Sequence, residues 1–120
     1  MIFVHGFNAQ PEATWIPAQY WNNIPEALAE IGAKVYVPKL APWMPTNIRT
    51  QQLIEYTRCV QEKTGVSQVV VFGHSQGAPS VRQLSYWMKK HDGYNPPNGN
   101  TVIQSAISIA GINHGGNIIV

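Results

Sequence analysis

The chain has 120 residues, of which 44% are apolar and 12% are charged, and its formal net charge is +2. This length suits one domain with a buried core and not two. The sequence has no basic run or basic patch, so a nucleic-acid partner has no support, and no apolar run approaches the ~20 residues of a membrane-spanning segment. The single cysteine, Cys59, forms no internal disulfide and is expected to be a small packed residue.

Short apolar runs and helical spacing alternate along the chain. Apolar or β-branched runs predict strands over residues 2–4, 34–37, 68–72 and 101–109. Apolar residues at helical spacing predict helices over residues 23–31, from 46 or 47 to about 63, and from 76 to about 90. This alternation predicts an α/β fold, with a parallel sheet of about four strands and helices on both of its faces.

Each predicted helix has an apolar side that is expected to face the core. In the first helix this side consists of Ile24, Ala27, Leu28 and Ile31. In the second it consists of Leu53, Thr57, Val60 and Thr64, with Tyr56 beside them, and in the third of Ala78, Val81, Leu84, Ser85 and Met88.

The strand at residues 68–72 leads directly into Gly73-His74-Ser75-Gln76-Gly77, and the third helix begins at once. Gly-x-Ser-x-Gly between a strand and a helix is typical of a nucleophile elbow, a strained turn that holds the serine Oγ clear of the backbone. The two glycines have no Cβ, so strand and helix can pass closely. Unpaired N–H groups at the helix N-terminus lie where an oxyanion would form. Ser75 is therefore the candidate nucleophile, and the alternative is a turn serine without chemistry.

Other candidate residues also follow predicted strands. His5-Gly6-Phe7 comes directly after the first strand, and His114 comes after the last. Because the carboxyl ends of parallel strands lie at one edge of a sheet, where ligands gather, we expect these residues and Ser75 to share one rim. His74 is expected to point away from Ser75 and to be a hydrogen-bonded structural residue.

On these residues the chain resembles the front half of an α/β-hydrolase, and most of all the triacylglycerol lipases of the Pseudomonas and Burkholderia type. The matching stretches run almost end to end: Phe3-Val4-His5-Gly6, Tyr20-Trp21, Ile24-Pro25-Glu26-Ala27-Leu28, Gly32-Ala33-Lys34-Val35-Tyr36-Val37-Pro38, Arg49 with Gln52-Leu53, Gly73-His74-Ser75-Gln76-Gly77, and residues 110–116. The resemblance implies a lipase or esterase that cleaves acyl esters such as triacylglycerols. It also implies a secreted parent protein, although this chain has no signal peptide.

The resemblance assigns roles to the site residues. Ser75 matches the nucleophile that forms the acyl-enzyme. The backbone N–H groups of Phe7 and Gln76 match the two donors of the oxyanion hole. His5 and Gly6 match the motif that shapes the oxyanion-hole loop.

In such lipases the catalytic acid, the catalytic histidine and a structural calcium site come later in the chain than the residues present here. After Ser75 the sequence contains one carboxylate, Asp92, and two histidines, His91 and His114. His91 and Asp92 follow the helix that leaves the elbow, so we expect them at the opposite end of the sheet. His114 matches a loop histidine that is not the catalytic one, although it could serve as a surrogate base from the same rim.

We therefore expect residues 1–120 to form one incomplete α/β-hydrolase domain, with neither metal nor cofactor of its own and little activity alone. Its substrate would be a lipid or another acyl ester, and the apolar loop at Trp43-Met44 would suit contact with an acyl chain. A polyester depolymerase, a thioesterase or an acyltransferase would use the same serine. The second class of function is a truncated, non-catalytic remnant or interaction module that keeps a relict elbow.

Overall fold

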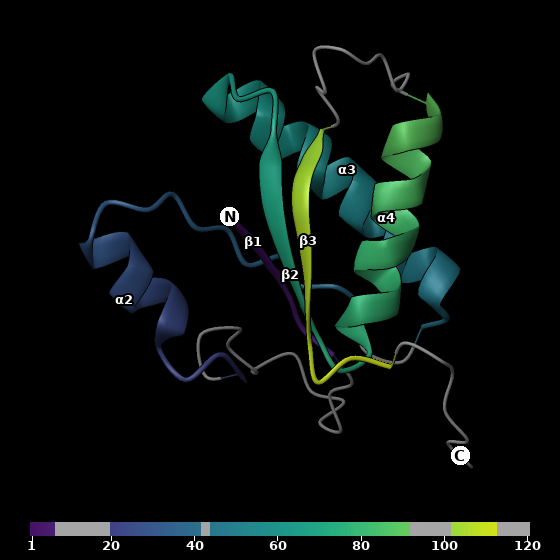
Figure 1. The fold of residues 1–120 in the computed structure, drawn as a ribbon, viewed down its shortest axis with the longest axis horizontal. Helices are drawn as coiled ribbons and strands as arrows, with labels where there is room; N and C mark the ends of the chain where they lie inside the picture. Colours follow the sequence, from purple (N-terminus) through teal and green to yellow (C-terminus); the bar gives the residue numbers. More distant parts are fainter. Residues whose placement is uncertain (7–19, 42–43, 92–101, 113–120) are drawn as a thin grey trace.

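The structure, a computed structural model, describes residues 1–6, 20–41, 44–91 and 102–112. Figure 1 shows the helices and strands that these residues form. In chain order they are β1 (Ile2–Val4), α2 (Ile24–Glu30), α3 (Thr46–Thr64), β2 (Val69–His74), α4 (Gly77–His91) and β3 (Ile103–Ile109). The three helices predicted from apolar spacing are confirmed.

The strands form one parallel sheet with β2 in the centre, between β1 and β3. Ile2 is paired with Val71 on one side of β2, and His74 is paired with Ile109 on the other. All three strands run in the same direction, so their carboxyl ends lie together at the lower edge of the sheet in Figure 1. The predicted α/β arrangement of a parallel sheet and helices is thus present.

Residues 34–37, predicted as a strand, do not form one. This segment runs beside β1 and pairs with it through a single bridge, Ile2 with Tyr36. The Phe3 N–H donates to the Tyr36 carbonyl over 3.0 Å, and the Tyr36 N–H donates to the Met1 carbonyl over 2.8 Å. Pro38 has no N–H with which to extend the pairing, and β1 offers only a short partner. The described residues therefore contain a sheet of three strands rather than about four.

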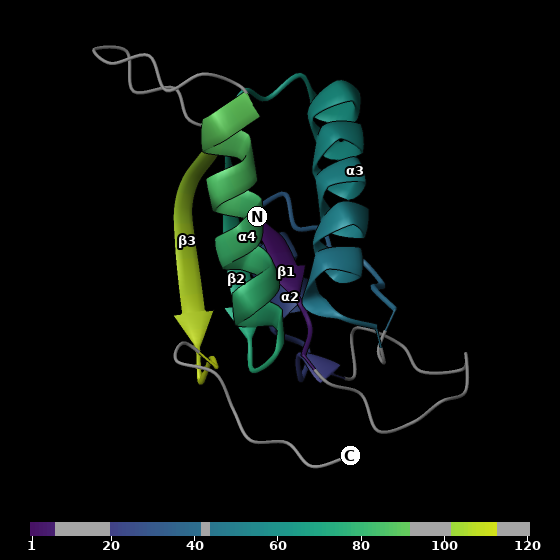
Figure 2. The ribbon, with the colours of Figure 1, turned by 90° about the vertical axis from the view of Figure 1, so that its right-hand side faces the viewer.

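The main core lies between the sheet and the helices α3 and α4, which are side by side over one face (Figure 2). Alternate residues of β1 and β2 are buried in it: Ile2, Val4, Val69 and Val71. The helices contribute Leu53, Thr57 and Val60 from α3, and Ala78, Val81, Leu84 and Met88 from α4. Fully burying each of the larger apolar side chains stabilises the fold by roughly 1.5–3 kcal/mol. The core sides predicted for these two helices are confirmed, although Thr64 and Ser85 are only half-buried.

The opposite face of the sheet carries an aromatic cluster and the helix α2. Figures 1 and 2 place α2 across the sheet from α3 and α4. Phe3 stacks on Phe72 with ring centroids 4.6 Å apart, and Trp21 meets Phe3 edge-on at 5.0 Å. Helices therefore lie on both faces of the sheet. On this face the contact is made by the aromatic rings of Trp21, Phe3 and Phe72.

The apolar stripe predicted for the first helix is not buried. Ile24 is 49% exposed and Ile31 is 81% exposed, and Pro25 is the buried residue of α2. Trp21, which precedes the helix, is 5% exposed and makes the contact with the sheet that the stripe was expected to make. The apolar spacing predicted the helix correctly but did not predict which residues pack it against the sheet.

Cys59 and the strand β3 are both exposed, and only the exposure of Cys59 differs from what the sequence predicted. Cys59 lies exposed on α3, outside the buried positions of that helix, so its prediction as a packed residue is wrong. The strand β3 is an edge of the sheet, and every residue after Ile103 in it is exposed. Ile107 and Ile109 keep 39% and 41% of their surface exposed, so this edge presents apolar side chains.

Candidate active site

Ser75 lies in a tight turn between the central strand β2 and the helix α4. Its φ angle is 54°, in the left-handed region that a residue with a Cβ rarely adopts. The turn is held by the Ser75 N–H, which donates to the Ile109 carbonyl over 3.1 Å, and by the Ser75 carbonyl, which accepts from the Ala78 N–H over 3.1 Å. Such a conformation costs on the order of 1–3 kcal/mol, so the surrounding structure must impose it.

Glycines permit the close packing around this turn. A Cβ added to Gly73 would lie 2.8 Å from Cα of Ala78, at the start of α4. A Cβ added to Gly77 would lie 2.9 Å from the His5 carbonyl oxygen and closer still to that of Val4. The helix α4 therefore begins directly against the ends of both β1 and β2, and these two close approaches require glycine at Gly77 and Gly73.

Gly6 brings the end of β1 against Ser75. A Cβ added to Gly6 would lie 2.8 Å from Cβ of Ser75, 2.8 Å from the carbonyl oxygen of His74 and 2.9 Å from Oη of Tyr20. The sequence predicted that the segments following these two strands would share one rim, and the described residues His5, Gly6 and Ser75 do meet there.

The His5 ring is 1% exposed and joins two backbone segments. The Leu40 N–H donates to Nε2 over 3.0 Å, and Nδ1 lies 2.9 Å from the Gly6 carbonyl oxygen. Because Nε2 accepts a hydrogen bond, a neutral ring carries its proton on Nδ1 and donates it to Gly6. Burial lowers the pKa of His5, which favours this neutral form. The ring is thus a structural clamp on the segment that leaves β1.

Arg49 supports the same segment from α3. Its side chain is fully buried, and Nη2 donates to the carbonyl oxygen of His5. Burial lowers the pKa of the guanidinium. Its Nε and Nη1 have no hydrogen-bond partner among the described residues. Arg49 was part of the resemblance in sequence, but no pattern in α3 predicted that it would reach β1.

Tyr20 connects the ends of β1 and β2. The Gly6 N–H donates to the Tyr20 hydroxyl oxygen over 2.9 Å, and that oxygen lies 2.5 Å from Nδ1 of His74. The Tyr20 ring also meets the His74 ring edge-on, with centroids 5.3 Å apart. His74 is half-buried and hydrogen-bonded, as a structural role requires. The sequence did not single out Tyr20 as a site residue, because its two partners lie in distant parts of the chain.

Several predicted site residues fall outside the described ranges: Phe7, Asp92, His114 and Trp43. Gln76 is half-buried directly after Ser75. His91 ends α4, which begins at the elbow and runs to the other end of the sheet, as predicted (Figure 1). Asp and Glu residues of the described part are all exposed on helices α2 and α3. The described residues therefore bring together Ser75, Gly6 and His5 but offer no carboxylate to complete a triad.

In the described part of the chain, His, Cys, Asp and Glu side chains form no group of three or more that could hold a metal ion. The calcium site implied by resemblance was expected outside this sequence and stays a prediction. Among the same residues, no helix has the length and apolar character needed to cross a membrane.

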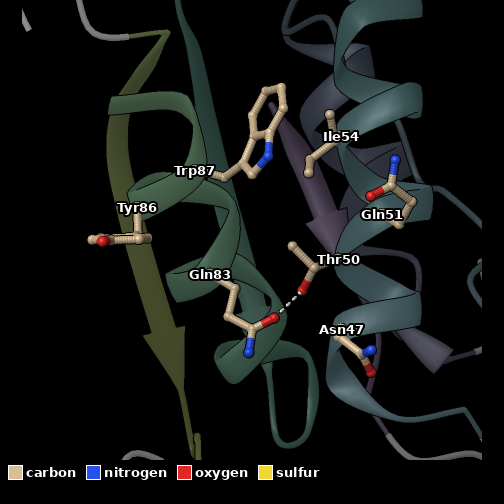
Figure 3. A pocket seen from close by; sticks show the side chains of 7 residues that line it. All are labelled: Asn47, Thr50, Gln51, Ile54, Gln83, Tyr86 and Trp87. Atoms are coloured by element: carbon tan, nitrogen blue, oxygen red, sulfur yellow. Dashed lines mark hydrogen bonds between the residues drawn. The ribbon is translucent and has the colours of Figure 1, made fainter. Parts of the chain in front are cut away.

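A separate groove of about 340 Å³ lies between α3 and α4 (Figure 3). It is lined by Asn47, Thr50, Gln51, Ile54, Gln83, Tyr86 and Trp87. The Thr50 hydroxyl crosses it and donates to Oε1 of Gln83 over 2.8 Å. Among the described residues that line it there is neither a carboxylate nor an imidazole, and Ser75 is not one of them. The groove therefore adds no acid or base to the candidate site.

Comparison with curated proteins gives consistent matches. A triacylglycerol lipase of Pseudomonas fragi is 30% identical over 96 residues, which are 80% of this chain and 29% of that protein. A triacylglycerol lipase of Burkholderia plantarii is 34% identical over 88 residues, 71% of this chain and 24% of that protein. This chain is similar to bacterial triacylglycerol lipases. The resemblance predicted from the motifs is confirmed.

A third lipase, from Vibrio cholerae, is 29% identical over 85 residues and matches 27% of its own length. The chain thus spans less than a third of the length of these lipases. No protein-family model matches it.

Proposed function

We propose that the encoded protein is a serine ester hydrolase of the lipase or esterase type, with Ser75 as its nucleophile. The observation that carries this proposal is the contact between two strand ends: Ser75 stands in a left-handed turn after β2, and Gly6 lies directly against it. An elbow serine beside a second backbone segment is the arrangement that acyl transfer requires, because the oxyanion needs donors from both sides.

The reaction would follow the serine hydrolase scheme. A base takes the proton of Ser75 Oγ, and the oxygen attacks the ester carbonyl to give a tetrahedral oxyanion. The alcohol then leaves with a proton, and water releases the acid from the acyl-enzyme. The backbone N–H groups of Phe7 and Gln76 are proposed to hold the oxyanion, and losing one such donor typically costs roughly 10²–10³ in rate.

His5 is proposed to fix the oxyanion-hole loop rather than to take part in proton transfer. The peptide unit that follows Gly6 is planar, so its orientation is set wherever its carbonyl is held. The Gly6 carbonyl accepts the Nδ1 hydrogen of His5, and the other ring nitrogen is occupied by the Leu40 N–H. With both nitrogens engaged, His5 has no lone pair to serve as a base for Ser75.

The proposed substrate class is an acyl ester of a lipid, because the similar proteins are named triacylglycerol lipases. The triad acid and base are assigned to no described residue. His91 lies at the far end of α4, and the only other candidates after Ser75 in this sequence are Asp92 and His114. We propose that the acid and the base are supplied by parts of the protein other than the described residues.

The test is active-site labelling of the complete encoded protein with a fluorescent fluorophosphonate, beside hydrolysis of p-nitrophenyl esters. Wild type is expected to label and to turn over, and Ser75→Ala is expected to do neither. Ser105→Ala, an exposed serine on β3, is the matched control and is expected to behave as wild type. A folded wild type that never labels would favour the non-catalytic remnant with a relict elbow. Labelling that survives Ser75→Ala would show that the reactive nucleophile is another residue and would overturn the assignment of Ser75.

A further inference from the structure

We infer that Tyr20 is a positioning residue of the nucleophile site, whose hydroxyl joins the Gly6 backbone to the His74 ring. This inference rests on the proposed hydrolase function. Tyr20 has no assigned role in the Gly-x-Ser-x-Gly motif or in the serine hydrolase reaction scheme.

The hydroxyl lies between the two segments that flank Ser75. Its oxygen accepts the Gly6 N–H at 2.9 Å and lies 2.5 Å from Nδ1 of His74, to which the hydroxyl can donate when that nitrogen is unprotonated. His74 is bonded covalently to Ser75, and Gly6 touches the Ser75 side chain. One hydroxyl therefore links the nucleophile turn to the backbone segment beside it.

The ends of β1 and β2 need such a connection. Backbone pairing of the two strands stops at Val4 with Gly73, one residue before His5 and His74. Beyond that point, Gly6 is held at its carbonyl by His5 and at its N–H by Tyr20. Loss of the hydroxyl would leave the N–H of the buried Gly6 unpaired and would let the Gly6 segment move relative to Ser75.

The surroundings of Tyr20 keep its hydroxyl in place and protonated. The ring is enclosed by three others, His5 at 5.9 Å, Trp21 at 5.2 Å and His74 at 5.3 Å between centroids. Burial raises the pKa of Tyr20, so the phenol keeps the hydrogen that it donates. Phenylalanine at position 20 would keep these ring contacts. Tyr20→Phe therefore tests the hydroxyl alone.

The experiment uses the complete encoded protein and two readouts. The first is hydrogen exchange of the Gly6 amide, followed by NMR after selective ¹⁵N-glycine labelling. The second is the rate at which the fluorophosphonate modifies Ser75. Tyr20→Phe is expected to speed Gly6 exchange and to slow labelling, each about three- to tenfold, the range set by one net hydrogen bond. Tyr86→Phe, which removes an exposed phenol from α4, is expected to change neither.

Variants of His74 separate a hydrogen-bond role from packing. Asparagine places its amide close to the position of Nδ1, so His74→Asn is expected to retain most of the labelling rate, whereas His74→Leu is expected to lose as much as Tyr20→Phe. The double variant Tyr20→Phe/His74→Leu is expected to be no slower than the slower single variant, because both changes break one link.

Three results would overturn the inference. They are unchanged Gly6 exchange in Tyr20→Phe, His74→Asn as slow as His74→Leu, and single-variant effects that multiply in the double variant. Failure of the hydrolase proposal has a different signature, since wild type would then label no faster than Ser75→Ala. If Gly6 exchange still rises in Tyr20→Phe in that case, the hydroxyl is a structural link and its positioning role is rejected.

Discussion

Gly6 lies against Ser75 so closely that a methyl group on Gly6 would stand 2.8 Å from Cβ of the serine. Carbon atoms in van der Waals contact are about 3.5–4.0 Å apart, so only glycine fits at this position without a clash. The same methyl group would meet the His74 carbonyl oxygen at 2.8 Å, and this backbone atom cannot turn away as a side chain could. The end of β1 is therefore fitted to the nucleophile turn.

Gly6→Ala is expected to force these two segments apart. Overpacking of this kind costs roughly 1–3 kcal/mol of stability, and it should also slow fluorophosphonate labelling of Ser75 by at least about tenfold. The measurement is chemical denaturation together with labelling in the complete protein. Gly32→Ala is the control. No atom lies within 4 Å of its added Cβ, so alanine causes no clash there, but the φ of +95° is unfavourable for alanine. It should lower stability and leave labelling unchanged, and equal labelling in Gly6→Ala would contradict the prediction.

The left-handed conformation of Ser75 predicts a conflict between stability and function. Ser75→Gly is expected to be more stable than Ser75→Ala by roughly 1 kcal/mol, because glycine adopts a φ of 54° without a Cβ penalty. Both variants lack the hydroxyl and should be inactive. Urea denaturation of the two variants side by side gives the answer, and equal midpoints would show that the turn is unstrained.

The buried His5 predicts that stability falls in acid. Burial lowers the pKa of His5 below its ordinary value of 6.5, so near that pH the unfolded chain binds more protons than the folded one. Its contribution is fully present above pH 6.5 and is lost as the pH falls toward the folded pKa, at up to about 1.4 kcal/mol per pH unit.

His5→Gln tests this prediction, because glutamine offers an oxygen to the Leu40 N–H but does not titrate. The free energy of unfolding of the variant is expected to depend less steeply on pH than that of wild type between about pH 5 and 7. The two are compared at about pH 8 as a baseline, where His5 is neutral in both folded and unfolded states. Parallel curves over the whole range would rule out His5 as the source of the slope.

The open edge at β3 predicts self-association of the 120-residue chain. Ile107 and Ile109 are 39% and 41% exposed on an outer strand of the described sheet, and an exposed apolar edge strand favours edge-to-edge pairing. Ile107→Lys is expected to raise the monomer fraction in analytical ultracentrifugation. Ile31→Lys makes the same exchange at a site 81% exposed beside α2 and should have little effect. A wild-type chain that is monomeric and unfolds cooperatively would refute this prediction.

The sequence by itself determined the elements around Ser75. Helical spacing located α3 and α4 and their buried sides, and the β-branched run before Gly73 located β2, because these signals depend on residues a few positions apart. The glycines on both sides of Ser75 predicted a tight strand-to-helix turn for the same reason. The local pattern was not sufficient everywhere, because residues 34–37 were predicted to form a strand and only a single bridge forms there.

The tertiary structure decided which side chains hold that turn. His5 meets the Leu40 backbone 35 positions away, and Tyr20 meets His74 across 54 positions. It also decided that Trp21, rather than the stripe of α2, packs against the sheet. Such contacts form only when parallel strands bring their carboxyl ends to one edge, and no local period in the chain specifies which buried donor will meet which acceptor there.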